Sequence, residues 1–79
     1  MLAALALVCR QAREEAGLTQ LDIATPAGVS HETISRFERG DGWPQGVGRI
    51  IRIYEAECGL EPFTLWARAV RLAREGPDS

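Results

Sequence analysis

The chain has 79 residues, of which 46% are hydrophobic and 25% charged, and its formal net charge is -2 at pH 7. A chain this short has too little core to divide, so we expect residues 1–79 to form a single domain, and the apolar content excludes a disordered chain. The negative charge argues against binding nucleic acid regardless of sequence, although it leaves room for a local basic face.

The first predicted helix covers about residues 2–16. Its apolar residues recur at three- and four-residue steps, namely Leu2, Leu5, Cys9, Ala12 and Ala16. Gly17 follows where a left-handed C-terminal cap is expected. The opening run MLAALALVC is too short to cross a membrane and lacks the basic start of a signal peptide, so we interpret it as a buried helix start.

The second helix is predicted to begin after Thr19, which is suited to cap it, with Asp22 near the positive end of the helix. Its apolar side is supplied by Leu21, Ile23 and Ala24. We expect a short helix, because Pro26 cannot donate to the helical ladder and disfavours helical geometry at the residue before it.

A tight turn and a third helix follow. Gly28 permits the turn, and the side chain of Ser30 is placed to cap the amide of Thr33. Ile34 and Phe37 are three residues apart and are expected to face inward. The helix is predicted to end at the next glycine, where the sequence DGWPQGVG predicts a loop.

The remaining residues predict two more helices. Apolar residues follow helical spacing between about residues 47 and 58, and Gly59 marks the end of that helix. Pro62 suits the first turn of a last helix, at about residues 62–75. Since no segment alternates apolar and polar residues as a half-buried strand does, the predicted fold class is all-α, with five helices.

The second and third predicted helices share a fixed pattern of packing residues, which are Gln20, Ala24, Gly28, Val29, Ile34 and Phe37. With the segments REEAGLTQ and AGVSHETISRFERG, this pattern resembles the Cro and phage-repressor family of helix-turn-helix proteins, also called XRE-like regulators. The resemblance implies a compact lambda-repressor-like domain with its helix-turn-helix core at about residues 19–40. It also implies a homodimer that binds a palindromic operator in double-stranded DNA, in the cytoplasm and at the nucleoid.

The resemblance places the third helix in the major groove. With Ile34 and Phe37 on the inward side, the residues expected to meet bases are His31, Glu32, Thr33 and Arg36. Arg36 suits O6 and N7 of guanine, and Glu32 can accept from the N4 amine of cytosine. The alternative is that His31 and Glu32 are solvated residues at a helix start, where an acid also suits the helix dipole.

Phosphate contacts are expected at helix amino ends and from nearby arginines. The residues predicted to make them are Thr19, Gln20, Ser30, Arg10 and Arg39. Arg13 and Glu38 occupy positions that often pair in this family, and we expect a structural pair; Arg13 lies near the DNA backbone whether or not the pair forms. Pro26 departs from the family pattern and puts the last turn of the second helix in doubt. Trp43 either covers the core, which we expect, or lies against the sugar-phosphate backbone.

The last helix has apolar residues on more than one side. Phe63, Trp66, Ala67 and Val70 form one stripe, with Leu65, Ala69 and Leu72 beside it. Because one stripe can pack inward while the other meets a partner, we expect homodimerisation through Leu65, Trp66, Ala69 and Leu72; the alternative is plain core packing. The arginines of this helix are interpreted as a solvated ridge rather than a second DNA site.

No catalytic set emerges from one histidine, scattered carboxylates and two cysteines without zinc spacing, so we expect no enzyme, no metal, no cofactor, no small-molecule substrate and no membrane partner. The predicted function is a sequence-specific transcriptional regulator that blocks promoters by occupying an operator. The alternative is a protein-interaction module on the same fold, such as an antitoxin or antirepressor, which the acidic charge and the two-sided last helix favour.

Overall fold

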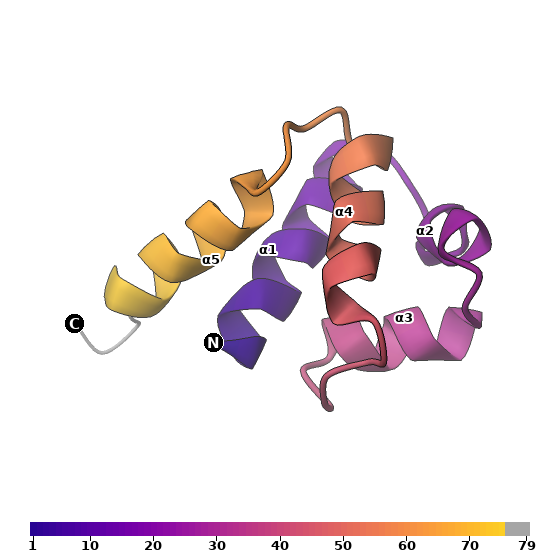
Figure 1. Ribbon diagram of the computed structural model, residues 1–79, viewed down its shortest axis with the longest axis horizontal. Helices are drawn as coiled ribbons and strands as arrows, with labels where there is room; N and C mark the ends of the chain where they lie inside the picture. The colour runs from indigo at the N-terminus through magenta and orange to yellow at the C-terminus, as the bar shows by residue number, and fades with distance from the viewer. Residues whose placement is uncertain (76–79) are drawn as a thin grey trace.

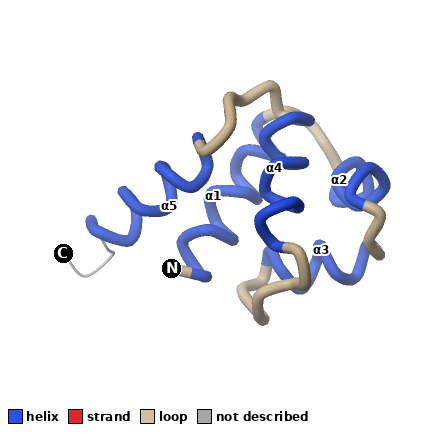
Figure 2. Tube along the Cα trace, viewed as in Figure 1, coloured by secondary structure: helices blue, strands red, loops and turns tan. Residues whose placement is uncertain are grey.

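The computed structural model describes residues 1–75, and in that range it contains helices joined by loops and no strand (Figures 1 and 2). The helices are α1 (Leu2–Glu15), α2 (Gln20–Ala27), α3 (His31–Glu38), α4 (Val47–Glu57) and α5 (Thr64–Glu75). The predicted all-α fold of five helices is therefore confirmed for these residues.

Helix α1 is the hub of the packing. It contacts α5 on one side and α3 and α4 on the other, while α2 packs against α3 and α4. Figure 1 shows α5 on the side of α1 away from the α2–α3 pair, which lies at the opposite end of the molecule. Residues that could meet a partner on α5 are thus well separated from the exposed side of α3.

All five helices contribute to one hydrophobic core. Its largest fully buried side chains include Leu5, Ile23, Ile34, Phe37, Ile51, Tyr54 and Leu65. The ring of Phe37 meets that of Tyr54 edge to face, with centroids 6.0 Å apart. Cys9 is buried in this core, and burial raises the pKa of its thiol, so it is an unreactive packing residue.

Helix α2 starts with a capping box and continues through its proline. The Thr19 hydroxyl accepts from the Asp22 N–H at 3.1 Å, and the Asp22 carboxylate accepts from the Thr19 N–H at 2.8 Å. Our doubt about the last turn is wrong, because α2 runs through Pro26 to Ala27. Gly28 then closes the helix in the left-handed conformation, at φ 70°. A proline this close to the helix end removes only one backbone donor, and its ring lies in solvent.

Two side chains and one helix start differ from the prediction. Leu21 was expected on the apolar side of α2 but is 58% exposed. Trp43 was expected to cover the core but is 49% exposed, since the α3–α4 loop turns outward through glycines with positive φ. Pro62 precedes α5 rather than starting it, because Phe63 takes a φ of 71° and helical geometry begins only at Thr64.

The apolar stripe of α5 that was expected to meet a partner faces the core instead. Leu65 and Ala69 are fully buried, and Trp66 and Leu72 are partly buried against the same core. This corrects the expected dimerisation set, since a partner cannot touch Leu65 or Ala69 in this fold. The physical reason is that two adjacent apolar stripes are equally suited to face α1, and the pattern does not say which one does.

Candidate nucleic-acid interface

Helix α3 presents a polar side to solvent. The Ser30 hydroxyl caps it by accepting from the Thr33 N–H at 3.1 Å, as predicted. Ile34 and Phe37 face the core with 0% and 1% exposure. The opposite side is left to exposed polar residues, which are His31, Glu32, Arg36 and Arg39, with Thr33 half-buried at its edge. The sequence-predicted base-reading residues are therefore accessible, apart from the partial burial of Thr33.

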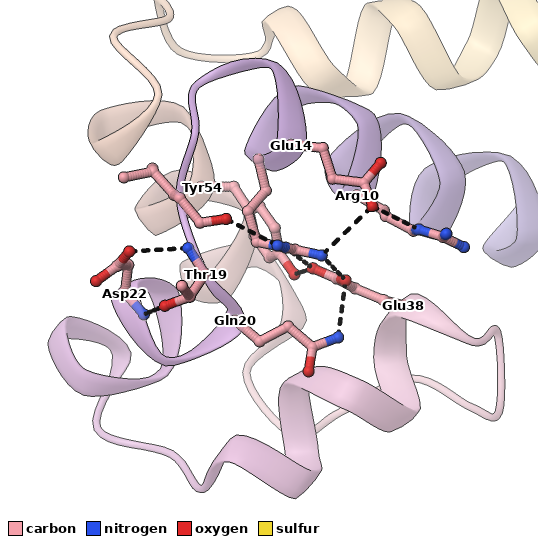
Figure 3. A network of polar contacts seen from close by, with 9 residues as sticks. Arg10, Glu14, Thr19, Gln20, Asp22, Glu38 and Tyr54 are labelled. Atoms are coloured by element: carbon pink, nitrogen blue, oxygen red, sulfur yellow. Dashed lines mark hydrogen bonds and ion pairs between the residues drawn. The ribbon is translucent and has the colours of Figure 1, made fainter.

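Beneath this exposed side, the carboxylate of Glu38 joins four helices (Figure 3). Arg13 Nε and Nη2 donate to its two oxygens at 2.8 Å and 2.9 Å, in bidentate geometry. Tyr54 Oη donates at 2.5 Å and Gln20 Nε2 at 3.0 Å. The predicted Arg13–Glu38 pair is thus formed. We refer to Arg13, Gln20, Glu38 and Tyr54 as the Glu38 network; it ties α3 to α1, α2 and α4.

Acidic groups surround one arginine on the exposed side of α3. Arg39 donates to Asp41 at 3.1 Å and to the Ser35 hydroxyl at 2.8 Å. Its Nη2 also lies 3.6 Å from the Glu32 carboxylate. Because Arg39, Glu32 and Asp41 are largely exposed, each of the two ion pairs contributes about 0.2–1 kcal/mol. We refer to Glu32, Ser35, Arg39 and Asp41 as the Arg39 cluster.

Two hollows border α3, one toward each end. Toward its N-terminus, Thr19, Gln20 and Leu21 share an open hollow with His31. Toward its C-terminus, Thr33 and Arg36 share a second hollow with the α3–α4 loop. The exposed polar side of α3 thus lies between two shallow hollows.

A family model described as a helix-turn-helix domain matches residues 4–62. The chain belongs to the helix-turn-helix domain family. Helices α2 and α3 form the motif of this helix-turn-helix protein, and in such motifs the second helix lies in the major groove of DNA. The family is one of DNA-binding domains and is typically non-enzymatic. Searches of curated proteins and of solved structures each gave no match.

Hydrogen bonding fixes the charges inside the helix-turn-helix protein. Burial alone would raise the pKa of Glu38. The hydrogen bonds from Arg13, Tyr54 and Gln20 lower this pKa by more than burial raises it, so the pKa lies below its usual value. The hydrogen bond to Glu38 raises the pKa of Arg13, and burial raises that of Tyr54. At neutral pH the network holds one anion and one cation. Glu38 therefore adds no net repulsion toward DNA.

Sequence reasoning missed the Tyr54 hydroxyl and part of the role of Gln20. Helical spacing explains why the Tyr54 ring is buried but says nothing about its hydroxyl. A buried tyrosine hydroxyl needs a partner, and that rule was the available signal. Gln20 was predicted to contact phosphate, yet one hydrogen of its amide is used by Glu38. Only its second amide hydrogen and its backbone N–H remain for DNA.

The other residues predicted to contact phosphate differ in whether their side chains already have partners within the protein. Thr19 and Ser30 are engaged as caps, and Arg39 lies in the Arg39 cluster. Arg10 pairs with Glu14 at 3.2 Å along α1. By contrast, Arg36 is exposed and forms no ion pair with any residue in 1–75.

Across residues 1–75, no helix combines the length and the hydropathy that crossing a bilayer demands.

Proposed function

We propose that this helix-turn-helix protein is a transcriptional regulator of the Cro and phage-repressor type, which occupies operator DNA with α3 in the major groove. The observation that carries the proposal is the exposed polar side of α3, anchored from below by the Glu38 network. Arg36 stands on that side without an ion pair among the described residues and is the cation best placed for DNA. A fixed helix with a free arginine suits recognition of base edges.

Within the proposal, Arg36 donates to O6 and N7 of guanine, and Glu32 accepts from the N4 amine of cytosine. Arg39, 3.6 Å from Glu32, offsets the repulsion between this acid and the DNA phosphates. His31 adds a donor or an acceptor at the start of α3. Thr33 lies at the edge of the contact, since its hydroxyl is 2.9 Å from that of Ser30.

Phosphate contacts position the helix in this proposal but do not read sequence. The first backbone N–H groups of α2 and α3, next to Gln20 and Ser30, have no partner within their own helix and suit phosphate oxygens. Arg10 and Arg39 contribute charge, but each must first release its acidic partner, Glu14 or Asp41. Their contribution is accordingly smaller than that of an unpaired arginine.

We also propose that the protein binds a palindromic operator as a homodimer. With Leu65 and Ala69 buried, the apolar surface left for a second copy lies between α1 and α5. Met1 and Leu7, which are 54% and 41% exposed, border a hollow there with Leu72. A two-fold contact at this surface would present two α3 helices to successive half-sites.

The proposed function is tested by selection from random duplex DNA at low salt. We expect enrichment of one motif by the parent protein and loss of that motif in Arg36→Ala. Arg71→Ala is the matched control, because Arg71 is an exposed arginine on α5, remote from α3. Failure of the parent protein to enrich any motif would overturn operator binding.

A second candidate function is a protein-interaction module, such as an antitoxin or antirepressor. It is favoured by the Arg39 cluster, in which Glu32 and Asp41 offset the exposed arginine that directly follows α3. The same selection separates the two functions: a module of this kind enriches no DNA motif, whereas a regulator does.

A further inference from the structure

Helix α5 carries apolar side chains on its outward side as well as in the core. Ala67 and Val70 are exposed, at a spacing that puts them on one side of the helix. Arg71 and Arg74 follow them at four-residue steps and extend that side. Figure 1 shows α5 at the edge of the molecule, beside α1. With the residue that precedes the helix, we refer to Phe63, Ala67, Val70, Arg71 and Arg74 as the outer α5 face.

Phe63 has a backbone conformation that a side chain disfavours. Its φ is 71°, and every other residue in 1–75 with a positive φ is a glycine. Pro62 and Phe63 are the central residues of a turn in which the Thr64 N–H donates to the Glu61 carbonyl at 3.2 Å. Glycine is the usual residue at the third position of a turn with positive φ there, because a β-carbon is strained in that region. The backbone alone therefore favours glycine over phenylalanine at this position.

The ring of Phe63 gains little within residues 1–75 to offset this strain. It is 67% exposed and lies outside the hydrophobic core. The backbone around it is fixed, since the Phe63 carbonyl accepts from the Ala67 N–H at 3.0 Å and the Thr64 hydroxyl donates to the Glu61 carbonyl at 2.7 Å. A strained residue that holds a large apolar ring in solvent, next to further exposed apolar residues, indicates a contact with another molecule.

The charges of the outer α5 face favour an acidic partner. Arg71 and Arg74 are exposed and form no ion pair with any residue in 1–75. Glu75, the one acid of α5, lines the hollow beside α1. A second copy laid on this face brings the same two arginines to it, whereas a chain with carboxylates beside an apolar stripe complements both.

We propose that the outer α5 face binds an acidic amphipathic helix of another protein. The apolar stripe of that helix packs on Phe63, Ala67 and Val70, and its carboxylates pair with the two arginines. The face lies at the opposite end of the molecule from the α2–α3 pair, so a partner bound there leaves α3 free (Figure 1). The inference goes beyond the proposed function and holds whether or not α3 binds DNA.

The first test selects ligands for the full chain from a displayed library of helical peptides. Each peptide carries an apolar stripe at helical spacing, and the positions beside the stripe are randomised among glutamate, glutamine and lysine. We expect glutamate to be enriched at these positions. Enrichment of lysine, no preference among the three, or failure to enrich any peptide would overturn the proposal.

Phe63→Gly separates partner binding from folding. Because the variant removes the ring and also relieves the positive φ, the urea midpoint should stay the same or rise. Affinity for the selected peptide should fall by about tenfold or more, as for aromatic residues at the centre of an interface. A lower midpoint would assign the ring to the fold, and unchanged affinity would remove it from the interface; either result overturns the proposal.

Leu21→Ala is the matched control for the loss of an exposed apolar side chain. Leu21 is 58% exposed on α2, at the other end of the molecule (Figure 1). Its affinity for the selected peptide should stay within about twofold of the parent protein, since about 0.4 kcal/mol is twofold. A loss equal to that of Phe63→Gly would show that the peptide does not bind at the outer α5 face.

Reversing the charge of the face tests the chemistry of the partner. The double variant Arg71→Glu with Arg74→Glu should lose the acidic peptide and enrich lysine in place of glutamate. Unchanged selection by this variant would refute the pairing. Arg36→Ala should bind the selected peptide as tightly as the parent protein does. Loss of operator binding in Arg36→Ala without loss of the peptide thus keeps the two functions apart, and each can fail alone.

Two other occupants of the face give different results. Binding to phosphatidylglycerol vesicles that is lost in Phe63→Gly, without enrichment of an acidic peptide, would assign the face to an anionic membrane. Self-association that is lost in the same variant, again without an enriched peptide, would assign it to a second copy. Cosedimentation and analytical ultracentrifugation measure these outcomes, and either one would overturn the proposal.

Discussion

The carboxylate of Glu38 illustrates how a charge can be both buried and useful. It is only 7% exposed and receives four hydrogen bonds, two from Arg13 and one each from Gln20 and Tyr54. A buried ion pair of this kind adds little net stability compared with apolar packing, but breaking it leaves an uncompensated charge. Its value here is positional, because it fixes α3 against three other helices.

Arg13→Met should destabilise the protein by about 3–5 kcal/mol, because Glu38 would lose its counter-ion while staying buried. Urea unfolding measures this change. Arg10→Met is the control. Arg10 also pairs with a glutamate, Glu14, but that pair is exposed, so we expect a loss of stability below about 1 kcal/mol. Equal losses in the two variants would contradict the role assigned to the Glu38 network.

Glu32→Ala tests base reading by an acid. Removing its carboxylate should relax the preference for cytosine at one operator position by about tenfold, since a good side-chain contact to a base contributes about 1–3 kcal/mol of discrimination. Affinity for random DNA should fall less, or rise, because a negative charge is removed. Selection with the variant measures both; an unchanged motif would count against Glu32 as a base contact.

At the scale of elements, α4 and α5 are joined by a second buried carboxylate. Glu55 is 1% exposed, and its Oε2 accepts from the Leu65 N–H in the first turn of α5 at 3.0 Å. A carboxylate at the N-terminus of a helix is also stabilised by the helix dipole. The start of α5 is therefore capped from α4, and not by a side chain of its own loop.

The substitution Glu55→Ala tests this connection between α4 and α5. We expect a loss of about 1–2 kcal/mol, as for other lost caps, and faster amide hydrogen exchange in the first turn of α5. Glu57→Ala, which alters an exposed acid of the same helix, should change neither quantity appreciably. Faster exchange throughout α1 to α4, with α5 no more affected than the rest, would argue against a cap.

The elements also show which parts of the fold sequence can predict. Helices α1 to α3 follow from spacing and caps, because Thr19, Asp22 and Ser30 act within a few residues of themselves. The inward side of α5 and the direction of Trp43 depend on what packs against them, and neither is encoded locally. Of the candidate interface, the outward residues of α3 were predictable once Ile34 and Phe37 were assigned to the core. The Tyr54–Glu38 hydrogen bond was not, because it joins two separate helices.

For the whole molecule, the buried carboxylate of Glu38 makes stability depend on pH. The lowered pKa of Glu38 means that the folded state binds its proton less readily than the unfolded chain does. The stabilisation is complete above the unfolded carboxyl pKa, about 4.3, and is lost as pH falls through the lowered folded value.

Acid unfolding measures this dependence. The free energy of unfolding of the parent protein should fall as pH is lowered below about 4.3. Glu38→Gln should be less stable at neutral pH and should show a shallower decline in acid, since that group no longer titrates. Parallel declines in the two proteins would show that other carboxylates control the acid transition.

The whole molecule separates the groups that hold α3 from those that face outward on it. The Glu38 network and the core fix the backbone of this helix, and none of them needs His31, Glu32 or Arg36 for its own contacts. The outward positions are therefore free to be exchanged at little cost in stability. Under the proposed function, a population carrying this protein can acquire a new operator by substitutions in one helix turn or two, with the scaffold unchanged.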